Sequence, residues 1–197
     1  MSDVAFSSIE NMGARGGTSD TLNISSAGTV VISGDYSDFE VANLNGGNLD
    51  LTGSLEATTL TIQSGTAIGG DGTLTGDLVL ASGADLIFDI NDTLSVSGTV
   101  SLDSLFGVDD LIGLDNTIDN GTYTLISDTV TDFSTLGIEN FGLANAFDLG
   151  GGKEAYFEDG SLAVVVVPEP TTGVFLSLGL ISLSMLRRRR SLSEGSK

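Results

Sequence analysis

Apolar and polar residues alternate along most of the first hundred residues of this chain, which is the period of a β-strand. The alternating residues form short groups, namely Leu22/Ile24, Val30/Ile32, Leu49/Leu51, Leu60/Ile62, Leu78/Leu80, Leu86/Phe88/Ile90, Leu94/Val96 and Val100/Leu102. Turn residues separate these groups, for example at Ser33-Gly34, Asn45-Gly46-Gly47, Ser64-Gly65 and Ser82-Gly83. No amphipathic helix of useful length interrupts them, so the pattern predicts an all-β chain.

The apolar groups also recur at a loose period. The step from Leu60 to Leu78 is nearly as long as the step from Leu78 to Leu94. Each step has the size of one coil in a parallel β-helix, or solenoid, in which each coil buries its apolar row by stacking on the next. A β-sandwich is the alternative, because it also has short strands at regular spacing. The repeat and the scarcity of proline favour the solenoid.

Beyond residue 103 the repeat fades and aromatic residues become common. Residues 122–126 are predicted to form a strand, and residues 155–167 a hairpin that ends in a buried strand. A solenoid needs its open end covered, because an uncovered edge invites aggregation. We therefore assign residues 1–103 to the β-helix repeat region and residues 104–167 to a C-terminal β cap. A separate ligand-binding domain is the alternative for the second region.

The charge is divided unevenly along the chain. Residues 1–170 carry 26 acidic and 2 basic side chains, whereas residues 171–197 carry 1 acidic and 5 basic ones, within a net charge of −20. An acidic body repels phosphate, so we expect no nucleic-acid partner. The absence of histidine and cysteine excludes a thiol nucleophile, a Ser-His-Asp triad, a disulfide and an ordinary zinc site.

Carboxylates are therefore the only acid–base groups that the composition offers. Two acidic pairs are adjacent in sequence, Asp109-Asp110 and Glu158-Asp159. Neighbours on a strand point to opposite faces, so adjacency does not make a catalytic pair. We expect solvated surface acids and no catalytic residue.

Two stretches are similar to calcium-binding loops but lack the required ligands. Residues 69–74 have Leu74 where an aspartate is needed, and residues 115–126 place Ile126 where a bidentate acid would stand. We therefore expect no metal site, and the sequence offers no sign of a cofactor.

The C-terminal segment begins with the only two prolines of the chain, Pro168 and Pro170, which flank Glu169. Proline fixes φ and removes a hydrogen-bond donor, so this triplet is extended and resists strand pairing. Residues 171–186 follow without a charge and, as a helix, would extend about 24 Å, short of the roughly 30 Å hydrocarbon core of a bilayer. Length alone favours a buried core helix.

The basic cluster that follows changes this interpretation. It consists of Arg187, Arg188, Arg189 and Arg190. Four consecutive arginines do not suit the end of a core helix, whereas they suit the cytoplasmic end of a membrane segment. We therefore predict a single short transmembrane helix over residues 171–186, an exported body before it, and a cytoplasmic overhang at residues 191–197.

The order Pro-Glu-Pro, apolar segment and arginine cluster strongly resembles the PEP-CTERM sorting signal of Gram-negative bacteria, here over residues 168–190. The resemblance implies that an exosortase, an integral-membrane transpeptidase or protease, recognises and processes the tail. It further implies that Pro168, Glu169 and Pro170 are the recognition element and that the arginine cluster is the membrane stop. The body would be held transiently at the inner membrane and then reach the cell surface or extracellular matrix.

A second resemblance lies in the body, at residues 70–84, which read Gly-Asp-Gly-Thr-Leu-Thr-Gly-Asp-Leu-Val-Leu-Ala-Ser-Gly-Ala. This segment is similar to the autotransporter-associated β-strand repeat, in which the pattern spans one strand and its turn. The resemblance implies a right-handed parallel β-helix of the kind that forms stalks.

These observations lead us to expect an exported, non-enzymatic cell-surface or extracellular-matrix protein. It would be structural or adhesin-like, with an exosortase as processing partner and extracellular polysaccharide as a further partner. The alternative is a secreted carbohydrate-active enzyme on the same scaffold, because two carboxylates suffice for glycan hydrolysis. Residues 1–20 show neither the basic region nor the apolar core of a signal peptide, so we expect an N-terminal truncation.

Overall fold

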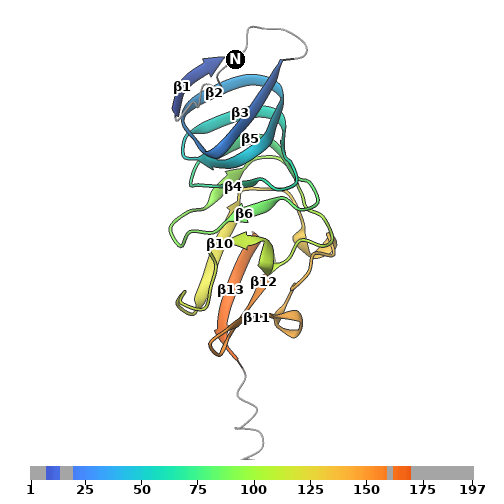
Figure 1. The fold of residues 1–197 in the computed structure, drawn as a ribbon. Helices are drawn as coiled ribbons and strands as arrows, with labels where there is room; N and C mark the ends of the chain where they lie inside the picture. The colour runs from blue at the N-terminus through green and yellow to red at the C-terminus, as the bar shows by residue number, and fades with distance from the viewer. Residues whose placement is uncertain (1–7, 14–19, 159–161, 170–197) are drawn as a thin grey trace, which may run out of the picture. The chain divides into compact units, whose positions relative to one another are not determined.

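Segments that follow one another in the sequence stack as parallel strands, coil upon coil (Figure 1). The computed structural model describes residues 8–13, 20–158 and 162–169. These residues contain no α-helix; 59% of them are in strands, and they form a β-solenoid of about four turns. This confirms the all-β prediction. The chain divides into two compact units, residues 1–167 and residues 168–197, and the first holds the solenoid.

The described residues form strands, most of them short, and three single-turn 3₁₀ helices. The first group of strands is β1 (Ser8–Gly13), β2 (Thr21–Leu51), β3 (Ser54–Ile62), β4 (Ala67–Gly69), β5 (Thr73–Leu80), β6 (Asp85–Ile87), β7 (Leu94–Val96), β8 (Val100–Ser101) and β9 (Leu111–Ile112). The second group is β10 (Gly121–Ser127), β11 (Phe147–Gly150), β12 (Lys153–Glu158) and β13 (Leu162–Pro168). The 3₁₀ helices are η1 (Val108–Asp110), η2 (Phe133–Thr135) and η3 (Leu143–Asn145).

The strand β2 connects two faces of the coil, because its 31 residues bend from one face to the other. Its middle pairs in parallel with β3, where Leu44 lies opposite Ile62, and its end pairs in parallel with β4, where Leu49 lies opposite Ile68. One stack continues from β3 to β5 and the other from β4 to β6. All pairings among β1 to β9 are parallel, which excludes an antiparallel β-sandwich for these strands.

Two predicted turns lie inside β2 instead of ending it. They are residues 33–34 and residues 45–47. Glycine lets the strand bend at the second of them, because Gly47 has a φ of 76° and a Cβ there would lie 2.2 Å from the backbone oxygen of Gly28. The chain therefore turns a corner of the coil without leaving the hydrogen-bonded ladder.

The length of a coil changes along the stack. Leu60 lies opposite Leu78, which confirms that the step between these two leucines is one coil. The predicted step from Leu78 to Leu94 is wrong, because Leu78 pairs with Val100, further along the chain, and Leu94 pairs with Ile126. The loop between β6 and β7 lengthens this coil. The spacing of apolar residues alone therefore predicted, wrongly, that Leu94 stacks on Leu78.

The core fills the inside of the coils. Burial alternates along β3 and β5 on either side of the bulge, so that inward side chains of β3 meet inward side chains of β5 one coil away. Three buried pairs join these strands: Leu55 with Leu74, Leu60 with Leu78, and Ile62 with Leu80. Burying one such side chain stabilises the fold by about 1.5–3 kcal/mol relative to leaving it in water.

The strands after residue 103 leave the coil pattern. Strand β10 pairs in parallel with β7 and antiparallel with β13, so the sheet of the coils continues into antiparallel strands. Strand β10 confirms the prediction for residues 122–126. Strand β13, whose residues 162–166 are all buried, confirms the predicted final strand. Strand β12 is its neighbour in the sheet, while the connecting residues 159–161 lie outside the described residues.

Candidate functional site

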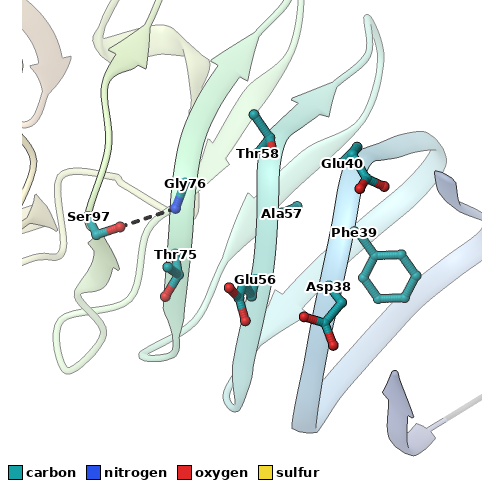
Figure 2. A pocket seen from close by; sticks show the side chains of 9 residues that line it. All are labelled: Asp38, Phe39, Glu40, Glu56, Ala57, Thr58, Thr75, Gly76 and Ser97. Atoms are coloured by element: carbon teal, nitrogen blue, oxygen red, sulfur yellow. Dashed lines mark hydrogen bonds between the residues drawn. The ribbon is translucent and has the colours of Figure 1, made fainter. Parts of the chain in front are cut away.

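An open groove lies on the solvent side of the coils, where neighbouring strands bend at the same place (Figure 2). The register shifts between Tyr36 and Phe39 of β2, and again between Glu56 and Thr59 of β3. Each shift sets two residues of one strand against one residue of the next, which is a β-bulge and bends the strand. The hollow that the stacked bulges leave has a volume of about 570 Å³.

Six of the nine residues that line this groove carry a side-chain oxygen. Figure 2 shows the side chains arranged across successive strands, with carboxylates from β2 and β3 and hydroxyls from the following coils. The oxygen-bearing residues are Asp38, Glu40, Glu56, Thr58, Thr75 and Ser97. The one aromatic residue in the lining, Phe39, is only 9% exposed, so its ring offers little surface for stacking against a sugar.

One of the three carboxylates already has a strong partner. Glu40 Oε2 accepts a hydrogen bond of 2.6 Å from the backbone N–H of Asp20, which lies one coil away. Asp38 Oδ2 accepts a 3.2 Å hydrogen bond from the hydroxyl of its neighbour Ser37. Asp38 and Glu56 are both exposed, so they are the carboxylates that the groove presents to a ligand. They can accept hydrogen bonds from hydroxyl or amino groups.

A second set of carboxylates gathers at the corner between β4 and β5 and in the loop before β7. Burial raises the pKa of Asp50, and the charge of Asp71 raises it further. Burial also raises the pKa of Asp92, and the charges of Asp89, Asp71 and Asp50 add to this. In the part of the chain that the structure describes, no group of three or more acidic residues is arranged to hold a metal ion. Because these charges raise the pKa values of their neighbours, the carboxylates of this set repel one another.

This repulsion predicts how the stability of the fold depends on pH. The pKa values of Asp50 and Asp92 are raised in the folded state, above the unfolded value of about 3.9. Their contribution to stability is therefore present below the unfolded pKa and is lost as the pH rises through the folded pKa. We expect Asp71→Asn to raise the melting temperature by about 1–3 °C at pH 7 and to change it little near pH 3.

Thermal unfolding followed by circular dichroism at both pH values measures this effect. The matched control is Asp119→Asn, because Asp119 is an equally exposed acid and does not contribute to the shifts of Asp50 and Asp92. An equal gain from Asp71→Asn at both pH values would show that relief of repulsion is not the cause.

The acidic pairs that are adjacent in sequence have separate surroundings. In the pair at residues 109–110, Asp110 Oδ2 accepts a 2.8 Å hydrogen bond from the N–H of Gly107, at the start of η1. Burial raises the pKa of Asp110, and this hydrogen bond partly offsets the effect. In the pair at residues 158–159, only Glu158 lies within the described residues. None of the described members of these pairs, Asp109, Asp110 and Glu158, lines the groove.

Two of the predicted sorting residues lie within the described residues. Pro168 is the last residue of β13 and is exposed, and Glu169 follows it and is half-buried. The others lie outside the described residues, and they are Pro170, Arg187, Arg188, Arg189 and Arg190. The predicted helix at residues 171–186 lies outside as well. No helix within the described ranges has the length and apolar character needed to cross a membrane.

The groove residues were not predicted from the sequence, because they come together only when the coils stack. A usable signal was nevertheless present, since Asp38 and Glu56 are separated by the same number of positions as Leu60 and Leu78, which is the predicted coil step. Comparison of this chain with protein-family models, with curated proteins and with solved structures found no match.

Proposed function

We propose that this chain is an exported, non-enzymatic protein of the cell surface or extracellular matrix. Its solenoid would be a right-handed β-helix that serves as a stalk or adhesin, with residues 104–167 as the C-terminal cap. Residues 168–190 would be the sorting signal that an exosortase processes, with residues 171–186 as a transient inner-membrane helix. Extracellular polysaccharide is the partner that we expect for the body.

The observation that carries this proposal is the junction between the body and the tail. The buried strand β13 is paired with β10 and ends on Pro168, the first residue of the Pro-Glu-Pro triplet. Proline cannot donate to a sheet ladder, so the triplet marks the end of regular pairing. Pro168 is exposed, so a membrane-bound processing enzyme would meet this first residue of the triplet where the last strand ends.

The outer surface of the coils supports a structural role. Side chains bond from one coil to the next, as where the Ser54 hydroxyl donates to Asp35 Oδ1 at 2.7 Å. Further along the stack, Asp77 Oδ1 accepts from both the N–H and the hydroxyl of Thr99, at 2.7 and 2.9 Å. Such bonds connect each coil to its neighbour, as the stacked coils of an extended stalk require.

Substitution of the Pro-Glu-Pro triplet by alanine tests the sorting proposal. The full chain, carrying an added export leader, is produced in a bacterial host that has an exosortase and in a matched host without one. Mass spectrometry should find no peptide beyond the triplet in the first host and an intact tail in the second. The triple variant Pro168→Ala/Glu169→Ala/Pro170→Ala should keep its tail in both hosts, because the recognition element is gone.

The control for this experiment is Asp119→Ala, which changes an exposed acid of the body and should be processed as the native chain is. Melting curves of all variants establish that the body is folded. An intact tail on the native chain in the exosortase-containing host would refute the proposal.

A secreted carbohydrate-active enzyme is the second candidate, and the groove is the observation that favours it. Asp38 and Glu56 come from adjacent coils and face the same hollow, and glycan hydrolysis requires two carboxyl groups about 5–10 Å apart. Under our first proposal, no reducing ends are released from neutral or acidic polysaccharides. If the native chain released reducing ends, and both Glu56→Gln and Asp38→Asn lost this activity while Asp119→Asn kept it, the enzymatic proposal would replace the first one.

A further inference from the structure

Two Asn-Gly dipeptides occur in this chain, Asn45-Gly46 and Asn120-Gly121. An asparagine before glycine can lose its side-chain amide, because glycine leaves the following backbone nitrogen unobstructed and lets the backbone rotate. Both asparagines are exposed to solvent, so exposure alone does not distinguish them. Their surroundings in the fold distinguish them.

Asn45 is held by the neighbouring coil of the solenoid. It lies inside the continuous strand β2, and its side-chain Nδ2 donates to Asn23 Oδ1 of the neighbouring coil at 3.3 Å. The next residue is also closely covered, because a Cβ at Gly46 would lie 3.2 Å from both Ser25 Oγ and the backbone oxygen of Ser26. The extended backbone and this cover keep the side-chain carbonyl away from the following nitrogen.

Asn120 has the opposite surroundings. It is the last residue of the loop before β10, and its side chain makes no hydrogen bond to the part of the chain that the structure describes. The loop on its N-terminal side is anchored, because the Tyr123 hydroxyl donates to the backbone oxygen of Asp119 at 2.8 Å and the Lys153 ammonium donates to that of Ile118. The side chain of Asn120 is therefore unrestrained, and the following Gly121 is the first residue of β10, opposite Val166.

We propose that Asn120 is a site of spontaneous deamidation and that Asn45 is protected by the fold. The backbone nitrogen of Gly121 attacks the side-chain carbonyl carbon of Asn120, and a carbon–nitrogen bond forms. The bond to the side-chain nitrogen breaks, and this nitrogen leaves as ammonia with the proton of the attacking amide. Water then opens the resulting succinimide at one of its two carbonyls, which yields aspartate or isoaspartate.

The position gives this modification a structural consequence. Asn120 immediately precedes β10, which pairs with β7 on one side and with β13 on the other. Either product adds a negative charge to an already acidic body, and isoaspartate also lengthens the backbone by one carbon at the entry to β10. We expect the pairing of β10 with β13 to loosen as the protein ages. This inference is independent of the sorting proposal.

The test is peptide mapping of the purified full chain after prolonged incubation at mildly alkaline pH, with mass spectrometry and enzymatic labelling of isoaspartate. In the folded chain, Asn120 should react roughly tenfold or more faster than Asn45, because reaction at Asn45 requires local opening of the coil. In denaturant the two rates should converge, since the fold no longer distinguishes the sites. Equal rates in the folded chain, or a faster reaction at Asn45, would overturn the inference.

A single variant separates the chemistry from the fold. A Cβ at Gly121 would lie 3.5 Å from the ring of Tyr123, which is an ordinary contact, so Gly121→Ala should fold as the native chain does. It should nevertheless slow the reaction at Asn120 roughly tenfold, because the added methyl group hinders the attacking nitrogen. An unchanged rate would overturn the proposed chemistry. Hydrogen exchange in β10 and β13 should be faster in aged native chain than in aged Gly121→Ala, and equal exchange would overturn the structural consequence.

Discussion

Replacing Gly76 by alanine should destabilise the solenoid by about 3 kcal/mol or more, which is among the largest effects that a single substitution causes. Gly76 lies in β5 with a φ of 135°, a conformation that side-chain-bearing residues rarely adopt. A Cβ there would lie 1.7 Å from the backbone oxygen of Ala57 in β3. Backbone cannot move aside as a flexible side chain can, so β3 and β5 would have to separate at the bulge.

Chemical unfolding in urea measures this effect against a matched control. Gly28→Ala adds the same methyl group at a glycine of another coil, where no atom lies within 4 Å of the new Cβ. We expect its unfolding midpoint to stay close to that of the native chain, within about 0.5 kcal/mol in free energy. Similar midpoints for Gly76→Ala and the native chain would contradict the close approach of the two strands.

The same glycine shapes the groove. Its N–H donates to Ser97 Oγ at 3.1 Å, which links β5 to the following coil beside the lining carboxylates (Figure 2). The bulge in β3 is possible because β5 can approach it at Gly76. The groove is therefore a consequence of the bulges, where two residues of one strand lie against a single residue of the next.

Alternation within a strand could be predicted from the sequence, because it depends on local order alone. The inward leucines of β5 follow a period of two, as do Leu60 and Ile62 of β3, and the step from Leu60 to Leu78 could be counted directly. The next coil could not be predicted in this way. Its extra residues lie in the loop between β6 and β7, and their effect on register appears only when Leu78 meets Val100.

The glycines of β2 show a second limit of sequence reasoning. A cluster such as residues 45–47 has the composition of a turn, and turn chemistry alone predicts the end of a strand. In the fold, the neighbouring coil supplies the partner for this segment, and glycine allows the close approach to Gly28. Tertiary pairing thus overrides the local preference.

The two candidate sites also differ in how far the sequence alone could predict them. Pro168, Glu169 and Pro170 are contiguous, so their pattern could be recognised from the sequence. Asp38 and Glu56 become neighbours only through the register of β2 on β3 and the bulges beside it. Local motifs were therefore visible in the sequence, whereas the groove required the three-dimensional stack.

Leu60→Ala should cost about 2–5 kcal/mol of unfolding free energy, because it opens a cavity in the middle of the stack. Leu60 has no exposed surface and lies between Ala42 of β2 and Leu78 of β5. The small side chain of Ala42 cannot fill the space that the substitution leaves. Leu105→Ala is the matched control, because it removes the same atoms from a side chain that is 67% exposed, and it should cost less than about 0.5 kcal/mol.

Hydrogen exchange would show how far the damage from Leu60→Ala spreads. Coils of a solenoid are stabilised mainly by their nearest neighbours, so a defect in one coil weakens the adjacent interfaces first. We expect the largest loss of protection in β3 and its partners β2 and β5, with a smaller loss in β12 and β13. An equal loss in all strands would mean that the coils and the antiparallel strands unfold as one cooperative unit. The coil-by-coil account of stability would then be wrong, even if the loss of free energy were as large as expected.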